Sequence, residues 1–234
     1  MTQQKVVVVA GVGPGNGTAL AQRFAVEGTR VAMLARDKDR ADALAHPIDG
    51  ARGYACDVGS EASVKACFAA IRAELGEVSI LIFNAGTGVF ADVEHITAEQ
   101  FEASWRVNAF GAFLCSREVI PAMKEAGNGN IVFIGATASR RGGKATAAFA
   151  PAKAAQRSLA ESMARSLWPA GIHVSLIIVD GVVDLKTTRA KMPDKPDDFF
   201  VDPAGVAEIA WDLTRQSRRA WSFEVEARPF GENW

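Results

Sequence analysis

The sequence is poor in cysteine, which limits where the protein can work and how it is held together. Its 234 residues include three cysteines, Cys56, Cys67 and Cys115, and none of them forms a C-x-x-C pair. Disulfide-stabilised secreted proteins carry paired cysteines, whereas an odd number of separate thiols is typical of a reducing compartment. We therefore expect a cytoplasmic protein whose cysteines are buried thiols.

Histidine and tyrosine are scarce as well. The three histidines, His46, His95 and His173, are not spaced with cysteines or carboxylates as metal ligands are, so the sequence predicts no metal site. The only tyrosine is Tyr54, in a predicted strand. Any reaction that needs a phenol as proton donor therefore has a single candidate.

Long apolar runs and blocks of like charge are missing too. The apolar run behind the N-terminal MTQQK is five residues long, too short for a signal peptide, and no stretch is long enough to span a membrane. The formal net charge is −1, whereas a general nucleic-acid binder needs a clustered basic face. We therefore expect a small-molecule substrate, and neither a membrane nor a nucleic acid as partner.

The chain is organised around a β-branched run that ends in glycines. VVVVAGVGPGNG occupies residues 6–17, and apolar spacing predicts a helix directly after it. The familiar G-x-G-x-x-G does not fit, but G-x-x-x-G-x-G fits at Gly11, Gly15 and Gly17. A loop without Cβ atoms approaches a ligand closely, and the free N–H groups of the following helix attract a pyrophosphate. The unit is a candidate phosphate-binding loop, with a plain strand-exit turn as the alternative.

The remainder of the chain alternates apolar, strand-like runs with amphipathic helices. Such alternation indicates βαβ units and a parallel sheet, in one α/β domain over residues 1–234. The last strand alternates with period two, as a half-buried edge strand does, and an irregular, flexible substrate flap is expected at about 182–202. The predicted strands lie at 6–10, 30–35, 51–56, 80–83, 129–134, 173–179 and 221–226, and the predicted helices at 18–25, 37–45, 60–75, 97–126, 149–167 and 203–216.

The end of the second predicted strand bears on which dinucleotide binds. A carboxylate at that place holds the ribose 2′-hydroxyl of NAD, whereas an arginine suits the 2′-phosphate of NADP. Ala35 is followed by Arg36 and then by Asp37. The sequence favours NADP over NAD, although Asp37 is able to reach a diol and Arg36 is equally typical of an exposed helix start.

Taken in order, these features resemble the short-chain dehydrogenase/reductase family over nearly the whole chain. The glycine loop looks like that family's loop, and Asp57 stands where its adenine-contacting Asp follows the third strand. Asn84, Ala85 and Gly86 resemble its N-A-G turn. Two members of its catalytic tetrad are matched, by Asn108 in a predicted helix and by Lys153.

The resemblance implies a Rossmann-type, doubly wound, seven-stranded and mostly parallel sheet with helices on both faces. It places the ligand at the carboxyl ends of the strands, and it implies a homodimer or homotetramer joined through the helices at 97–126 and 149–167. The positions that match its dinucleotide site are Gly11, Gly15, Asn16, Gly17, Arg36, Asp57, Val58, Asn84, Ala85, Gly86, Lys153, Gly181 and Val183.

The other two members of the tetrad are missing. The family's Y-x-x-x-K reads here Phe149 to Lys153, and its serine is Ala136. In the family the tyrosine transfers a proton, the lysine lowers the tyrosine's pKa and binds the nicotinamide ribose, and the serine orients the reacting oxygen. Phe149 keeps the ring and lacks only the hydroxyl, so we expect an intact pocket without general acid–base help worth roughly 10²- to 10⁴-fold.

No residue of the sequence is an evident replacement for the phenol. Ser139 is the candidate substitute, with the same hydroxyl chemistry present at Thr137 and Thr146. The family's P-G after the sixth strand reads Asp180-Gly181, and its nearby threonine is Leu185, so Asp180 and Asp184 are further candidates for a proton carrier. For each of these residues, capping a loop or facing solvent is the simpler role.

Two functions therefore remain open. The first is an NAD(P)-dependent oxidoreductase that moves hydride between nicotinamide and a carbonyl, alcohol or activated alkene, with Lys153 and Asn108 as its surviving machinery. The second is a non-catalytic NAD(P)-binding protein with a sensing or structural role. The joint loss at Phe149 and Ala136 favours the second, and the resemblance favours the first.

Overall fold

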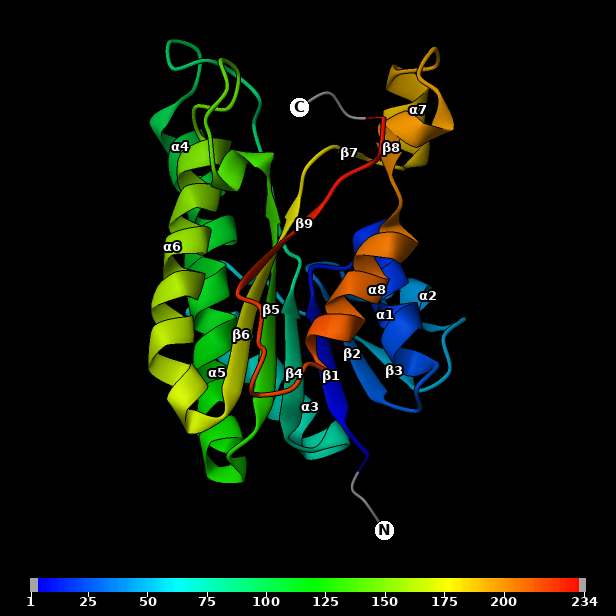
Figure 1. Cartoon of the computed structure of the whole chain (residues 1–234), viewed down its shortest axis with the longest axis vertical. Coiled ribbons are helices and arrows are strands. Elements are labelled where there is room, and N and C mark those ends of the chain that lie inside the picture. Colours follow the sequence, from blue (N-terminus) through cyan, green and yellow to red (C-terminus); the bar gives the residue numbers. More distant parts are fainter. Residues whose placement is uncertain (1–3, 232–234) are drawn as a thin grey trace.

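The computed structural model describes residues 4–231, which form a three-layered α/β domain (Figure 1). A seven-stranded sheet runs through its middle in the order β3-β2-β1-β4-β5-β6-β9, and every neighbouring pair is parallel. The strands are β1 (Val6–Ala10), β2 (Arg30–Ala35), β3 (Ala51–Ala55), β4 (Val78–Phe83), β5 (Gly129–Ala136), β6 (Ile172–Val179) and β9 (Glu224–Ala227). The expected doubly wound fold is confirmed.

Helices cover both faces of this sheet, as Figure 1 shows. One layer holds α1 (Asn16–Ala25), α2 (Lys38–Ala45) and α8 (Pro203–Leu213). The other layer holds α3 (Glu61–Leu75), α4 (Ala98–Trp105), α5 (Gly111–Ala126) and α6 (Phe149–Leu167). None of the helices in the described part of the chain is long and apolar enough to cross a membrane.

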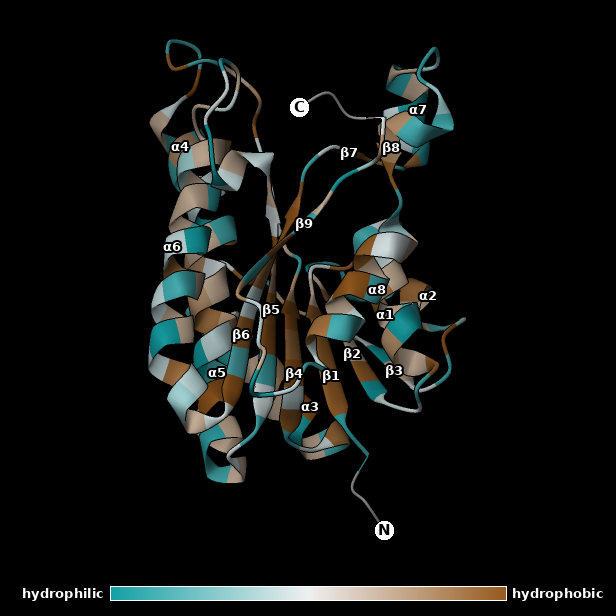
Figure 2. Cartoon of the chain, in the orientation of Figure 1, coloured by the Kyte–Doolittle hydropathy of each residue, from teal (hydrophilic) through white to brown (hydrophobic). Residues whose placement is uncertain are grey.

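The sheet separates two apolar cores, because successive side chains of a strand point to opposite faces. In β1, Val6 and Val8 belong to the core beneath α3, α5 and α6, whereas Val7 and Val9 belong to the core beneath α1 and α8. Every residue of β1 and of β6 is buried. Figure 2 shows the same arrangement, with apolar strands in the centre and hydrophilic residues on the outer sides of the helices. Strands covered on both faces read as continuous apolar runs, which is why the sequence reveals them.

The long helix predicted at 97–126 is helical throughout but changes its winding. A capping box of Thr97 and Gln100 starts α4, a π-helical turn covers Arg106–Phe110, and α5 continues from Gly111. The turn holds Asn108, an unfavourable residue for a regular helix interior. Because π-helical turns frequently occur at functional sites, the winding singles out Asn108.

The expectation of an irregular stretch at 182–202 is wrong. This segment contains β7 (Val182–Val183), α7 (Lys186–Lys191), a 3₁₀ turn (Asp197–Phe199) and β8 (Phe200–Val201), and β7 and β8 pair in parallel. Arg189 joins its parts, because the guanidinium pairs with Asp184 at 2.7 Å and also contacts Asp197. The segment is a small folded unit at the carboxyl end of the sheet.

Candidate cofactor and active site

The glycine loop follows β1 and accepts no other residue at two of its positions. Gly11 has a φ of +90°, and a Cβ atom there would lie 2.3 Å from the Cα atom of Ala85. A Cβ atom on Gly17 would lie 2.7 Å from the Cα atom of Val12. Both distances are far below van der Waals contact, so only glycine allows the loop to fold back on itself and on the turn after β4.

Two asparagines, Asn84 and Asn16, lie next to the glycine loop. The Nδ2 atom of Asn84 donates a hydrogen bond of 2.6 Å to the carbonyl oxygen of Gly11, which ties the N-A-G turn to the glycine loop. Asn16 begins α1 without a side-chain cap before it, and its Oδ1 atom is buried and has no partner within residues 4–231. Free N–H groups at a helix start fit the pyrophosphate of a dinucleotide, whereas the unpartnered Oδ1 atom of Asn16 is an acceptor and suits a donor such as a ribose hydroxyl. The predicted loop residues therefore come together as a cradle.

The end of β2 lies beside this cradle and carries cations. Arg36 is exposed there, and the Nη2 atom of Arg40, on α2, would lie 3.9 Å from a Cβ atom on Gly13. The carboxylate of Asp37 is engaged as the N-cap of α2, since its Oδ1 atom accepts a hydrogen bond from the N–H group of Arg40 at 3.1 Å. The sequence did not predict Arg40 as a cofactor contact, because it lies near the glycine loop only through the packing of α2.

Asp57 and Val58 follow β3, at the far side of the cradle from the active site. One oxygen of Asp57 accepts a hydrogen bond of 3.0 Å from the N–H group of Gly59, and its own N–H group donates to Ser63 Oγ at 2.9 Å. Tyr54 lies in the same strand, and its hydroxyl donates to Glu74 at 2.9 Å. Burial raises the pKa of Tyr54, and the bond to Glu74 raises it further, so this phenol is held protonated.

The side chains of Lys153 and Asn108 both lie next to Gly86 of the N-A-G turn. The Nζ atom of Lys153 donates to the carbonyl oxygen of Ile134 at 2.8 Å, and burial lowers the pKa of Lys153 to about 8. Asn108 donates from Nδ2 to the carbonyl oxygens of Thr87 and Ser104 at 2.7 and 2.8 Å, while its Oδ1 atom is buried without a partner in the described chain. A Cβ atom on Gly86 would lie 3.2 Å from that Oδ1 atom and 3.7 Å from Nζ.

Phe149 takes the place of the phenol in an apolar setting. Its ring lies 3.0 Å from where a Cβ atom on Gly88 would stand, and its centroid is 5.5 Å from that of Phe90. The Nζ atom of Lys153 is 6.0 Å from the same ring centroid. Ala136 ends β5. The structure thus places the lysine beside the aromatic ring of Phe149, and neither Phe149 nor Ala136 carries the hydroxyl that the resemblance leads us to expect at these positions.

The candidate substitutes for the missing acid are engaged elsewhere. The Oγ atom of Ser139 accepts a hydrogen bond of 3.1 Å from the N–H group of Ala136, so this serine caps the turn Thr137–Ser139. Asp184 is paired with Arg189, whose hydrogen bond lowers the pKa of Asp184. A carboxyl group with a lowered pKa is ionised at neutral pH and does not hold the proton that a general acid has to donate.

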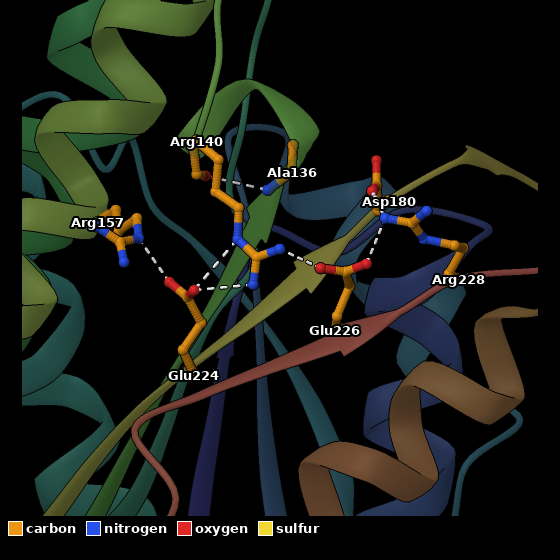
Figure 3. Close-up of polar contacts among 8 residues, drawn as sticks. Ala136, Arg140, Arg157, Asp180, Glu224, Glu226 and Arg228 are labelled. Atoms are coloured by element: carbon orange, nitrogen blue, oxygen red, sulfur yellow. Dashed lines mark hydrogen bonds and ion pairs between the residues drawn. The ribbon is translucent and has the colours of Figure 1, made fainter. Parts of the chain in front are cut away.

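Asp180 belongs to an ionic network that Figure 3 displays. It contacts Thr137 Oγ1 and Arg228, and Arg228 also contacts Glu226 on β9. Arg140 in turn joins Glu226 and Glu224, and Arg157 on α6 reaches Glu224. The network connects the turn after β5, the end of β6, the edge strand β9 and α6. Asp180 is therefore an ion-paired structural carboxylate.

The segment after β6 closes over the glycine loop. Gly181 and Val183 lie at its start, as predicted, and a Cβ atom on Gly15 would lie 2.5 Å from Cδ2 of Leu185 and 3.7 Å from Cγ1 of Val183. An apolar leucine thus packs at the position where the resemblance expects a threonine. Val183 is half-buried, in the short strand β7.

Sequence reasoning missed three features of this region. Gln156 is fully buried between Lys153 and Asn108, which helical spacing on α6 alone does not reveal. Phe90 covers Phe149 from a loop, where no periodicity marks contacts. The sequence spacing of His95 did not mark its carboxylate neighbours, since its Nδ1 atom lies 2.6 Å from Asp92 and both lie near Glu94 on the surface.

Comparison with known proteins identifies the family of the chain. The family model for short chain dehydrogenases matches residues 5–196. D-threitol dehydrogenase of Mycolicibacterium smegmatis is 37% identical over 132 residues, which are 55% of this chain and 51% of that protein, so the match spans about half the length of that relative.

Solved structures extend the similarity to nearly the whole chain. A short-chain dehydrogenase from Rhodopseudomonas palustris is 35% identical with a TM-score of 0.82, over 97% of this chain and 99% of that one. A metagenomic short-chain oxidoreductase in complex with NADP is 26% identical with a TM-score of 0.84, over 99% of this chain and 100% of that one. The chain is therefore a member of the short-chain dehydrogenase family of oxidoreductases.

Proposed function

We propose that the protein is an NADP(H)-preferring oxidoreductase with a weakened proton-transfer site. It moves a hydride between nicotinamide and a carbonyl, an alcohol or an activated alkene. One observation carries this proposal: the glycine loop, Asn84, Asn108 and Lys153 lie together at the carboxyl end of the sheet, whereas Phe149 stands where the acid is expected. The residues that the resemblance assigns to the dinucleotide support binding, and the lack of a hydroxyl on Phe149 supports a weakened proton transfer.

Each part of the dinucleotide has residues that would hold it. The glycine loop and the start of α1 at Asn16 would bind the pyrophosphate, Asp57 and Val58 the adenine, and Lys153 the ribose next to the nicotinamide, whose amide would meet Gly181 and Val183. Bound there, the dinucleotide supplies the hydride. Lys153 has a free side toward Gly86, and the rings of Phe149 and Phe90 would offer an apolar, partly exposed surface to the substrate.

The preference for NADP rests on the end of β2. Asp37, the one carboxylate there with access to a ribose diol, is used as a helix cap, and Arg36 and Arg40 remain as cations for a 2′-phosphate. The metagenomic relative in complex with NADP supports the same choice.

Hydride transfer is the direct test. We expect steady oxidation of NADPH with at least one substrate in a panel of aldehydes, ketones, quinones and enoyl thioesters. Rates should lie roughly 10²- to 10⁴-fold below those of an enzyme with a positioned acid. Rates equal to an enzyme-free blank across the panel would argue against catalysis.

A second function, dinucleotide binding without catalysis, is favoured by the packing around Phe149. Gly88 and Phe90 close around its ring, so the position of the phenol is apolar. The double variant Phe149→Tyr, Ala136→Ser separates the two functions. If the parent binds NADPH and turns nothing over while the double variant reduces carbonyls, the protein is a non-catalytic binder.

We further propose that the protein forms a homodimer or homotetramer through α4, α5 and α6. Phe101 and Trp105 on α4 are each 43% exposed, and Phe113 on α5 is 38% exposed. Trp105 stacks on Phe110, which stacks on Phe113, with centroid distances of 5.6 and 6.1 Å. A stack of partly exposed aromatic rings supports an interface with a second copy of the chain.

A further inference from the structure

Gln156 lies on α6 one turn beyond Lys153 and has no exposed surface (0%). A buried amide is costly unless its donors and acceptor are paired. The Nε2 atom of Gln156 donates to the carbonyl oxygen of Asn108 at 3.0 Å, and its Oε1 atom accepts from Nζ of Lys153 at 3.2 Å. One side chain thus joins both surviving members of the catalytic machinery.

The orientation of this amide follows from its neighbours. The carbonyl oxygen of Asn108 only accepts hydrogen bonds, so the NH₂ group of Gln156 must face it and the oxygen is left for Lys153. Asn108 itself is held in the π-helical turn by two hydrogen bonds to backbone carbonyls. The hydrogen bond to the backbone of Asn108 therefore fixes the position of the Gln156 amide.

The protonated amine of Lys153 has three donors, and two of them are used inside the protein. The carbonyl oxygen of Ile134 takes one at 2.8 Å and Gln156 takes the second at 3.2 Å. Gly86, which has no side chain, lies beside Nζ. The third donor is left for a ligand on the side of the N-A-G turn.

We propose that Gln156 is a positioning residue, which couples Lys153 to the backbone of Asn108 and keeps one donor of the lysine directed at the bound dinucleotide. This inference deepens the proposed function and rests on it only for the identity of the ligand. Gln156 does not touch the reacting atoms, and it acts through the charge and place of Lys153.

The ionisation of Lys153 depends on its burial and on its two hydrogen bonds, to Ile134 and to Gln156. Burial alone lowers its pKa. The ionisable groups on α6 and on the elements packed against it include Glu99, Glu102, Arg106, Arg157, Glu161 and His173, and none of them forms a hydrogen bond or ion pair with Nζ of Lys153 within residues 4–231. Gln156 supplies the side-chain oxygen that favours the ammonium form, so changes at this position should move the pKa of Lys153 with a predictable sign.

The test reads the ionisation of Lys153 without any dinucleotide. The ¹⁵N chemical shift of its Nζ atom, assigned by its loss in Lys153→Arg, is followed against pH in uniformly ¹⁵N-lysine-labelled protein. The wild-type inflection is expected at about 8. Gln156→Met removes the acceptor and should lower the inflection by about one pH unit, whereas Gln156→Glu places a negative charge there and should raise it by about one unit or more.

Gln22→Glu, which adds the same carboxylate on the exposed side of α1, is the matched control and should leave the inflection unchanged. Wild-type inflections in both Gln156 variants, with thermal unfolding still cooperative, would overturn the proposal, because a purely structural role predicts that result. If Gln156→Met fails to fold, Gln156→Glu decides alone.

A second arm measures NADPH binding against pH by fluorescence. Affinity should fall where Lys153 loses its proton, and the Gln156 variants should shift that pH in the same directions as the ¹⁵N inflection. If wild-type protein binds no dinucleotide, the proposed function fails, and the ¹⁵N titration still judges the role of Gln156.

Discussion

At the scale of single residues, the lysine of the active site is the most constrained group. Lys153 is buried beside a phenylalanine and forms no ion pair within residues 4–231. Two carbonyl groups, one from the backbone and one from Gln156, stabilise its charge. Burial nevertheless dominates and lowers the pKa of the amine to about 8. A group in that state is tuned to change its protonation near neutral pH, as groups in functional sites commonly are.

This lowered pKa predicts how stability depends on pH. An unfolded lysine has a pKa near 10.4, so between about pH 8 and pH 10.4 the unfolded chain binds more protons and the free energy of unfolding rises with pH. Relative to Lys153→Met, the wild type should gain on the order of 3 kcal/mol across this window. Chemical denaturation of both proteins at pH 7.5 and pH 10 measures it. A constant difference would show that Lys153 titrates normally.

The arginines near the glycine loop predict cofactor choice. Arg36→Ala and Arg40→Ala should each weaken NADPH binding about 10-fold or more, because a charge-assisted contact to phosphate contributes about 1.5–3 kcal/mol. NADH binding, which lacks that phosphate, should change little. Paired titrations with the two dinucleotides check this, with the exposed Arg165→Ala on α6 as the control variant. Equal losses for both dinucleotides would contradict the assignment.

At the scale of elements, ion pairs stabilise the short edge strand β9. Its four residues pair only with β6, and Glu224 and Glu226 are ion-paired to Arg140, which follows β5, while Glu224 also reaches Arg157 on α6 (Figure 3). Burial opposes ionisation of Glu224, but its bonds to Arg157 and Arg140 outweigh that cost and lower its pKa. The network therefore ties the C-terminal strand to the turn that carries Ala136 and Ser139.

Removing one carboxylate should loosen this strand. Glu224→Gln leaves two arginines without their shared partner, so stability at pH 7 should fall. Because the pKa of Glu224 is lowered, its contribution is present above the pKa of an unfolded glutamate and is lost as pH falls through the folded value. The difference from wild type, measured by urea unfolding, should thus shrink toward pH 3. A difference that grows on acidification would refute this account of β9.

The elements differ in how far the sequence predicts them, for physical reasons. β1 is a continuous apolar run and β4 and β6 are largely apolar because both faces of the sheet are covered, and the glycine loop is marked by positions where no Cβ fits. The unit of β7, α7 and β8 was expected to be irregular, because its two strands have two residues each and exist only through a pairing between distant positions. The same holds for Gln156, whose role comes from contacts with Asn108, 48 residues away.

At the scale of the whole molecule, the aromatic stack on α4 and α5 predicts self-association. Trp105→Ser together with Phe113→Ser should convert the proposed dimer or tetramer to monomers, because large rings at the centre of an interface contribute most of its binding energy. Light scattering after size exclusion measures the mass. Val26→Ser, at a 77% exposed site on the other layer, is the matched control. A wild-type mass equal to one chain would remove the proposed interface.

On the proposed function, the molecule as a whole combines a dinucleotide cradle with a site that lacks its acid. Family membership and fold are shared with known dehydrogenases, while the charges of the folded segment at 182–202 favour neither an anionic nor a cationic substrate. There Arg189 is neutralised by Asp184 and Asp197. If the proposed site is correct, its substrate contacts Phe149 and Phe90, and the panel of carbonyl and alkene substrates should therefore begin with apolar members.

The central claim, a preserved NADP site, is tested most directly by calorimetric titration of the purified protein with NADPH and with NADH. We predict saturable one-site binding of NADPH with a Kd on the order of micromolar, and weaker binding of NADH, as the cations beside the glycine loop require. The absence of binding heat for both dinucleotides at several temperatures would contradict the account.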